Sequence, residues 1–490
     1  MATSGRIAVI DIGSNSLRLV VYDGIGRAPF ALLNEKALCA LGRGLGRTGR
    51  LNPEGIVSAL SHLQRFVALA EAVGVIRLEL IATAAVRDAA DGADFVAEAR
   101  RRCGHSVRIL DGAAEGRLSA LGVVAGIPAA DGIVADLGGG SVELVPVRAG
   151  QAGIGATLPL GPLRLAEFSE DHRRLRELVD GHIGSVPWLR QQRGRGLYLV
   201  GGAWRALARI HMEQMRYPLH IIQGYTVLRS DAEQVFRFLG TLSRKSLEKI
   251  TSVSRKRAEN VPLAAFVLAR LAEAIEPERF VFSAYGLREG LVFDLLTEAE
   301  RQEDPLLVAC RGIAEARPRF GLSGDELFAW MSPLFPDESP SRRRLRLASA
   351  LLGDTAWNSH PDYRAEEAFQ HCLHMPVAGI DHSERVFVAT ALHARYGGAA
   401  DAEIKAQTRR LLGDAEHAAA RAIGLALRLG YTLSGGAPRL LTRTRLSLDE
   451  RELVLSAPAG DPISSGETVQ RRLDALGRAL ERRASIRSGD

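Results

Sequence analysis

Two short stretches of the sequence combine an aspartate with glycines and serines directly after an apolar run. The first stretch contains Asp11, Gly13, Ser14, Asn15 and Ser16, and the second contains Asp136, Gly138, Gly139, Gly140 and Ser141. Glycines allow the backbone to approach a ligand closely and to direct its N–H groups toward phosphate oxygens. The repetition therefore predicts a two-lobed phosphate site, with the aspartate facing the same ligand.

Three further positions could contribute to such a site. Arg87 follows a predicted strand and a run of small residues, and it could either clamp a phosphate or pair with the adjacent Asp88. Glu115 lies at the start of a predicted helix, where the helix dipole favours a carboxylate without any catalytic role. Gly202 follows a predicted strand over 196–200 and begins a predicted helix, so its backbone N–H is a candidate phosphate donor.

The elements around these residues alternate between strand and helix as far as residue 303. Residues 303–305 read as a linker, and about the next hundred residues are almost wholly helical. Glycine, serine and proline return near residues 431–442, before a small predicted hairpin and a helix over 469–480. We predict four domains, at residues 1–124, 125–303, 304–430 and 431–490.

The composition narrows the class of protein. With 490 residues, of which 46% are hydrophobic, several well-packed globular domains are expected. A net charge of +6 suits acidic partners, including a polyanionic small substrate, but falls short of a nucleic-acid-binding protein. No apolar run is long enough to span a membrane, and four scattered cysteines indicate a reducing compartment. We expect a soluble, cytoplasmic protein.

Five stretches, taken in order, carry a resemblance to a known family. They are residues 11–16, 82–89, 115–118, 136–143 and 285–290. Together they make most of residues 6–296 similar to the exopolyphosphatase and guanosine pentaphosphatase (Ppx/GppA) family, within the actin-like, sugar-kinase and Hsp70 ATPase superfamily. The resemblance implies an α/β fold: two ribonuclease-H-like lobes around a central cleft, then a mostly helical HD-like domain and a small α+β tail.

The resemblance also implies roles for individual residues. Glu115 matches the family's catalytic base, Asp136 and Glu143 match acids that we assign to Mg²⁺, and Arg87 matches an arginine near the scissile phosphate. The family usually has two adjacent acids at the base, whereas Ala114 and Gly116 flank Glu115 here. Glu143 follows Asp136 by seven residues, so a continuous strand could place the two side chains on opposite faces.

The helical region departs from the family's metal-binding pattern. Gly353 precedes Asp354 where an adjacent His-Asp pair is expected, and the nearby histidines have no recognisable metal spacing. We interpret this region as a binding and dimerisation module, which predicts a homodimer. The basic clusters at 342–344 and 255–257 could extend a polyanion path beyond the cleft.

The leading hypothesis is a Mg²⁺-dependent exopolyphosphatase that releases orthophosphate from inorganic polyphosphate. Guanosine pentaphosphate hydrolysis at the same site is the main alternative, since both substrates end in a phosphoanhydride. Phosphate transfer to a nucleotide is a third reading, and a polyphosphate- or nucleotide-sensing regulator is a non-enzymatic one. The presence of Asp11, Glu115, Asp136 and Glu143 together argues against the regulator.

Overall fold

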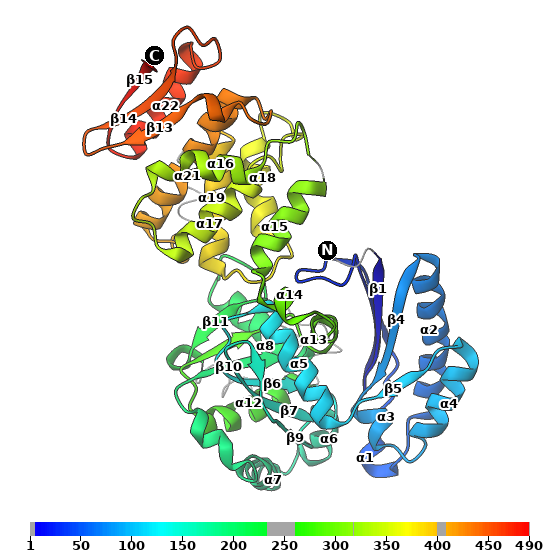
Figure 1. Cartoon of the computed structure of the whole chain (residues 1–490). Coiled ribbons are helices and arrows are strands. Elements are labelled where there is room, and N and C mark those ends of the chain that lie inside the picture. Colours follow the sequence, from blue (N-terminus) through cyan, green and yellow to red (C-terminus); the bar gives the residue numbers. More distant parts are fainter. Residues whose placement is uncertain (1–4, 233–259, 317, 399–407, 490) are drawn as a thin grey trace. The chain divides into compact units, whose positions relative to one another are not determined.

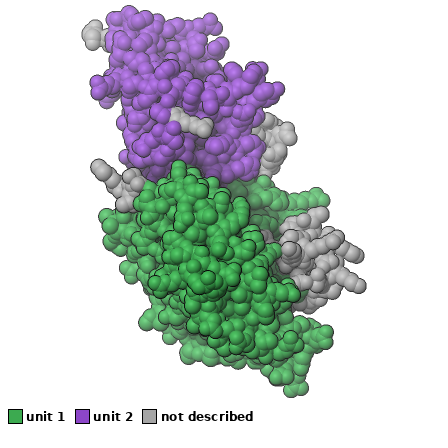
Figure 2. Space-filling model, turned by 90° about the vertical axis from the view of Figure 1, so that its right-hand side faces the viewer, with its two compact units in different colours: residues 1–303 green, residues 304–490 purple. Residues whose placement is uncertain are grey.

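The structure is a computed structural model that describes residues 5–232, 260–316, 318–398 and 408–489. The chain forms two compact units, residues 1–303 and 304–490, which are coloured separately in Figure 2. The division falls at the predicted linker, whereas the narrower boundaries at 124/125 and 430/431 stay predictions. No helix in the described ranges is both long and apolar enough to cross a bilayer.

The first sheet carries the first aspartate turn. Its five strands lie in the order β3-β2-β1-β4-β5. They are β1 (Arg6–Ile12), β2 (Ser16–Tyr22), β3 (Ala31–Leu38), β4 (Val75–Ala82) and β5 (Val107–Ile109). β1 and β2 form the predicted antiparallel hairpin, while β4 runs parallel to β1. The turn at residues 13–15 therefore lies at the same edge of the sheet as the end of β4.

The helices of this first half follow the apolar spacing of the sequence. They are α1 (Leu45–Thr48), α2 (Pro53–Ala72), α3 (Ala84–Asp88), α4 (Gly92–Cys103) and α5 (Gly112–Gly126). Proline opens α2, where its missing N–H costs no helical hydrogen bond. The apolar side of α2, including Leu63 and Phe66, is buried in the same core as β1 and β2.

The second sheet repeats the arrangement of the first. Its main path is β11-β12-β10-β6-β7-β8, and β9 pairs with β7. The strands are β6 (Gly132–Leu137), β7 (Val142–Arg148), β8 (Gln151–Ala152), β9 (Ala156–Leu158), β10 (Gly196–Val200), β11 (Tyr225–Leu228) and β12 (Arg279–Phe282). β6 and β7 form an antiparallel hairpin, and β10 runs parallel to β6, as β4 does to β1.

The helices within residues 162–302 are shown with the second sheet in Figure 1. They are α6 (Pro162–Leu165), α7 (His172–Gly184), α8 (Gly202–Gln214), α12 (Val261–Ile275), α13 (Leu287–Asp294) and α14 (Glu298–Gln302). α8 begins directly after β10 and α13 follows β12, so the ends of both strands lead into helix N-termini. The mixed α/β class predicted from the sequence is confirmed.

Residues 304–490 are helical first and mixed afterwards. The helices are α15 (Pro305–Ala316), α16 (Gly324–Met331), α17 (Pro340–Leu351), α18 (Arg364–His374), α19 (His382–Arg395), α21 (Asp414–Ser434) and α22 (Glu467–Ala479). The strands β13 (Arg445–Leu448), β14 (Glu452–Pro458) and β15 (Arg483–Gly489) form a small sheet. In this sheet β13 and β14 pair antiparallel, which matches the predicted hairpin.

Helices α5 and α13 approach each other closely because two glycines lie at their contact. A Cβ on Gly290 would lie 1.7 Å from the carbonyl oxygen of Leu118, and one on Gly122 would lie 2.1 Å from that of Gly286. Neither distance is possible without moving a backbone. The close contact fixes α5, which carries Glu115, against α13, which carries Arg288.

We predict that Gly290→Ala lowers the free energy of unfolding by about 3 kcal/mol, because the added methyl group forces two packed backbones apart. Chemical denaturation of the full chain measures the change. Gly181→Ala in α7 is the matched control, since nothing lies within 4 Å of a Cβ there. It should stabilise the helix by about 0.5 to 1 kcal/mol. Equal effects of the two substitutions would contradict the close contact.

Candidate active site

Both aspartate turns open into one cavity of about 240 Å³ within residues 1–303. The predicted residues that line it are Asp11, Gly13, Ser14, Asn15, Ser16, Glu115, Asp136, Gly138, Gly139, Ser141 and Gly202. Three predicted residues, Arg87, Gly140 and Glu143, do not line it. Gly140 instead borders a smaller neighbouring hollow, together with Ser14 and Asp88.

The two turns have the same backbone geometry. Gly13 N–H donates to the carbonyl of Ser16 at 3.1 Å, and Gly138 N–H donates to that of Ser141 at 3.0 Å. The turns also contact each other, because a Cβ on Gly139 would lie 3.0 Å from that of Ser14. The N–H groups of both leading glycines are therefore used inside their turns. The backbone donors left to face a ligand belong to the residues that follow them.

Glu115 lies in the first turn of α5 and is 7% exposed. One of its carboxylate oxygens, Oε2, accepts a hydrogen bond from Arg87 Nη1 at 2.8 Å. Burial raises the pKa of Glu115 to about 7; the carboxylates of Asp136 and Asp11 act in the same direction, whereas Arg87 opposes the shift. A carboxylate with this pKa can both accept and release a proton near neutral pH.

Arg87 makes the pair with Asp88 that the sequence suggested, and it also contacts Glu115, whereas its role as a phosphate clamp stays a prediction. Its Nε donates to Asp88 at 3.2 Å, and its Nη1 donates to Glu115 and to the Leu110 carbonyl, at 2.8 and 3.0 Å. Since Arg87 does not line the cavity, its contact with the site runs through Glu115. The observed geometry therefore makes Arg87 a positioning residue for Glu115.

Glu143 lies directly opposite Asp136 in the β6–β7 hairpin, so the two side chains share a face of the sheet. Seven residues of continuous strand would have separated them, but the turn reverses the chain. Glu143 is 1% exposed, and neither carboxylate oxygen makes a well-formed hydrogen bond in the described residues, although the nearby Ser141 side chain favours the charged form. Burial raises its pKa well above the usual range, and Glu115 and Asp136 add to this.

Gly116, the residue after Glu115, packs closely against the strand that carries Glu143. A Cβ on Gly116 would lie 3.2 Å from the Cβ of Glu143 and 3.1 Å from Val145. A larger side chain there would press on the buried carboxylate.

The two aspartates each have a bonded partner. Ser119 Oγ donates to Asp136 Oδ2 at 2.5 Å, and Arg288 Nη1 donates to Asp11 Oδ2 at 3.2 Å. Burial raises the pKa of both aspartates, and Arg288 opposes the shift in both. The two hairpins therefore bring two partly buried carboxylates to the same cavity, where α13 supplies a cation that acts on both.

Sequence reasoning missed four cations that line the cavity: Arg18, Lys36, Arg205 and Arg288. Arg205 lies in the first turn of α8, and its pKa is lowered to about 10 by burial and then by Arg288. A signal for it was present, since Arg205 follows the Gly201-Gly202 junction by one helical turn. Arg288 lies inside the 285–290 stretch that carried the resemblance, but no local pattern there indicates that it lies beside Asp11.

The donor set fits a hard divalent cation such as Mg²⁺. Carboxylate oxygens are its usual protein ligands, and both oxygens of Glu143 are buried without a well-formed hydrogen bond. In the described ranges no three His, Cys, Asp or Glu side chains converge into a complete metal cage. Mg²⁺ typically takes only one or two carboxylates and completes its shell with water and substrate phosphate. Asp136 and Glu143 remain the predicted ligands.

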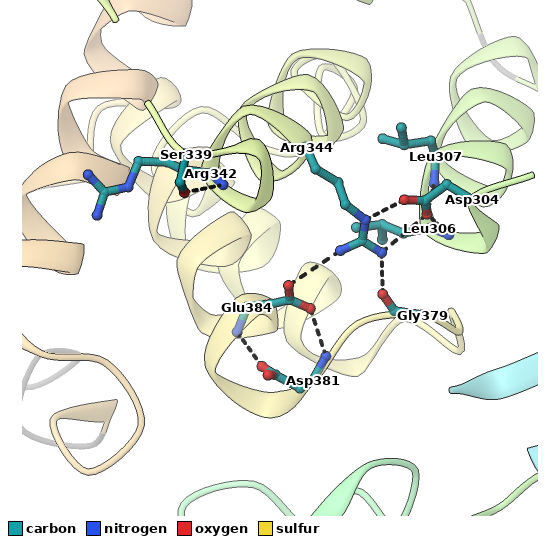
Figure 3. A network of polar contacts seen from close by, with 9 residues as sticks. All are labelled: Asp304, Leu306, Leu307, Ser339, Arg342, Arg344, Gly379, Asp381 and Glu384. Carbon is teal, nitrogen blue, oxygen red and sulfur yellow. Dashed lines mark hydrogen bonds and ion pairs between the residues drawn. The ribbon is translucent and has the colours of Figure 1, made fainter. Parts of the chain in front are cut away.

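The basic cluster at 342–344 does not form the free cationic path expected from the sequence. Arg344 is enclosed by Asp304, Glu384 and the Gly379 carbonyl, as Figure 3 shows. Arg343 lies over the Phe328 ring at 4.9 Å, and Arg342 reaches Glu416 at 3.5 Å. These arginines hold unit 2 together through internal pairs. The cluster at 255–257 lies outside the described residues.

The sequence of this chain matches models of known protein families. Residues 20–299, more than half of the chain, match the model of the Ppx/GppA phosphatase family. The chain belongs to this family. Residues 306–486 match a second model, described as the C-terminal region of exopolyphosphatase. Membership of the Ppx/GppA family confirms the prediction of an enzyme of the phosphoanhydride-hydrolase class.

Two curated proteins with different names are similar to this chain. Exopolyphosphatase 1 of Mycobacterium tuberculosis is 28% identical over 300 residues, which cover 59% of this chain and 87% of that protein. Retrograde regulation protein 2 of Saccharomyces cerevisiae is 25% identical over 442 residues, covering 80% and 72%. The second similarity extends well into unit 2.

Solved structures support the fold. An exopolyphosphatase from Cytophaga hutchinsonii superimposes with a TM-score of 0.54 at 24% identity, over 60% of this chain and 99% of that one. The Aquifex aeolicus member of the Ppx/GppA family gives a TM-score of 0.51 at 24% identity, over 59% and 97%. The predicted actin-like architecture of the first unit is confirmed.

We predict that Glu143→Gln stabilises the ligand-free protein by roughly 1 to 3 kcal/mol at pH 8, because it removes an unpaired buried charge. The raised pKa means that the folded chain binds this proton more tightly than the unfolded chain. Folded-state stability therefore falls as pH rises above the unfolded value, and the advantage of the variant should be smaller at pH 5. Thermal denaturation at both pH values measures it.

Glu170→Gln, at an exposed acid in the same unit, is the control and should change stability little. A Glu143→Gln protein that is less stable than the parent at pH 8 would show that Glu143 has a stabilising partner.

Proposed function

We propose that the protein hydrolyses the terminal phosphoanhydride bond of inorganic polyphosphate, with Glu115 as the general base. The observation that carries the proposal is the position of Glu115: it lines the phosphate-sized cavity, one oxygen is held by Arg87, and its pKa lies about 7. Similarity to proteins named exopolyphosphatase over 59% of the chain supports the choice of substrate.

In this mechanism the terminal phosphate lies between the two turns. The N–H groups of residues 14–16, 139, 141 and 202 donate to its oxygens, since turn amides and a helix N-terminus are suited to anions. Glu115 accepts a proton from a water molecule as that water attacks the terminal phosphorus. The bond to the bridging oxygen breaks, and orthophosphate and a chain shortened by one unit result.

Negative charge that builds up on the transferred group is offset by cations around the cavity. Arg288 and Arg205 are both buried beside Asp136 and line the cavity. Fixed cations in a dry site stabilise developing charge more than they would in water. Mg²⁺, held by Asp136 and Glu143, would neutralise phosphate charge and favour attack. Phosphoryl transfer needs this positioning and charge compensation and little covalent work from the protein.

Guanosine pentaphosphate is the second candidate substrate, because its terminal phosphate presents the same bond to the same residues. Parallel assays of phosphate release from long-chain polyphosphate, tripolyphosphate and guanosine pentaphosphate separate the two. Release from guanosine pentaphosphate alone would favour the alternative, and ATP formation from added ADP would favour phosphate transfer. The homodimer stays a prediction that light scattering can test.

We predict that Glu115→Gln lowers kcat by about 10² to 10⁴-fold, the usual contribution of a general base, while polyphosphate still binds. Phosphate release and an independent binding measurement are compared. Glu54→Gln is the matched control, because Glu54 also lies in the first turn of a helix but is exposed and outside the cavity. Full activity in the Glu115 variant would remove this residue as the base.

We also predict that kcat/KM rises with pH through about 7, because Glu115 accepts a proton only when deprotonated. At pH 6 the rate should be roughly a tenth of its plateau. Arg87 opposes the raised pKa, so Arg87→Gln should move the midpoint to higher pH. A profile that does not move in this variant would show that Glu115 does not set it.

A further inference from the structure

Unit 2 contains a cluster of arginines that the proposed chemistry does not use. The Arg428 cluster comprises Arg395 at the end of α19, Arg421 and Arg428 on α21, and Arg471 and Arg472 on α22. Arg421 and Arg428 are seven residues apart and so share one side of their helix. α21 packs against both α19 and α22 (Figure 1). The other four arginines all act on the pKa of Arg428, so they lie near it.

Most of these arginines lack a counter-ion. Arg395 reaches Asp354 at 3.5 Å, but the side chains of Arg421, Arg428, Arg471 and Arg472 make no hydrogen bond or ion pair within the described part of unit 2. Two acids on the same helices are engaged elsewhere. Glu416 pairs with Arg342 at 3.5 Å, and Asp474 accepts a hydrogen bond from Gln470 at 2.8 Å.

The cluster is partly buried, so its lack of neighbouring acids destabilises the folded state. Burial and then the neighbouring arginines Arg472, Arg395, Arg471 and Arg421 lower the pKa of Arg428 to about 10. The pKa of Arg472 is lowered by burial, Arg471 and Arg395. The Nε atoms of Arg395 and Arg472 are buried without a hydrogen-bond partner. An uncompensated buried charge destabilises a fold unless something pairs with it.

The backbone is adapted to hold one of these guanidinium groups. Gly397 has a φ of +93°, and a Cβ there would lie 2.3 Å from Arg428 Nη2. Any other residue at 397 would therefore displace the guanidinium. The guanidinium group of Arg428 therefore packs against the backbone just after α19.

We propose that the Arg428 cluster binds a phosphate-bearing anion at a site distinct from the cavity in residues 1–303. The planar guanidinium fork matches phosphate oxygens in pairs, and a multiply charged oxyanion can offset several arginines at once. The ligand could be free orthophosphate or a phosphate group within a polyphosphate chain. The inference does not depend on hydrolysis in the first unit.

The test measures binding to the full chain in buffer with EDTA and without Mg²⁺. Orthophosphate, tripolyphosphate and long-chain polyphosphate are titrated calorimetrically into the parent and into the double variant Arg428→Gln, Arg472→Gln. We expect at least one of these anions to bind the double variant about tenfold more weakly or to lose a binding site. The ligand-free double variant should also melt at a higher temperature than the parent, because repulsion between cations is reduced.

Two controls separate the site from general charge effects. Arg478→Gln removes an exposed arginine from the same α22 and should leave affinity unchanged. Arg428→Lys keeps the charge and should retain part of the binding. A difference seen with orthophosphate assigns the site to the free ion, and one confined to the longer anions assigns it to a chain. Equal binding of all three anions by parent and double variant would overturn the proposal, as would a lower melting temperature of the ligand-free double variant.

Discussion

The crowding of four carboxylates, two of them buried and two partly buried, is the constraint on which the first unit depends. Burial raises the pKa of Asp11, Glu115, Asp136 and Glu143, and in all but Asp136 at least one other carboxylate of the group raises it further. Such a group destabilises a folded chain unless cations or protons offset it. The raised pKa values show that protons offset part of this charge, and the surrounding arginines offset another part.

Each carboxylate has a different neighbour that offsets its charge, so the four side chains differ in their chemistry. Asp11 accepts a hydrogen bond from Arg288, Asp136 accepts one from Ser119, and Glu115 accepts one from Arg87. Glu143 has no comparable partner in the described residues. A divalent cation would remove the remaining imbalance, which is why we infer that Glu143 and its hairpin neighbour Asp136 form the metal side of the site.

Much of this arrangement could be predicted from the sequence because it rests on local patterns. An apolar run, a glycine turn and a second apolar run predict a hairpin, and its recurrence at residues 11 and 136 predicts paired lobes. Glu143 could have been placed as well, since the turn at 138–141 reverses the chain and sets it opposite Asp136. The error lay in counting residues along an unbroken strand.

Other features depend on contacts between distant segments, which no local pattern encodes. Arg288 meets Asp11 across 277 positions of sequence, and it does so because α13 packs on α5 at Gly290. The basic run at 342–344 is the opposite case, because its local pattern predicts a surface that the structure does not form. Its composition suggested a polyanion surface, yet Arg344 is enclosed by Asp304 and Glu384, whereas the unpaired arginines of α21 and α22 are scattered in the sequence.

The same differences among the carboxylates favour Glu115 as the base. Glu143 does not line the cavity, so water that approaches a bound phosphate cannot reach it directly. Asp136 and Asp11 line the cavity, but they are closest to the cations Arg288 and Arg205, which favour their charged forms and suit them to holding positive charge. Glu115 combines access to the cavity, one oxygen fixed by Arg87 and a pKa of about 7. Proton transfer at neutral pH needs all three properties in one side chain.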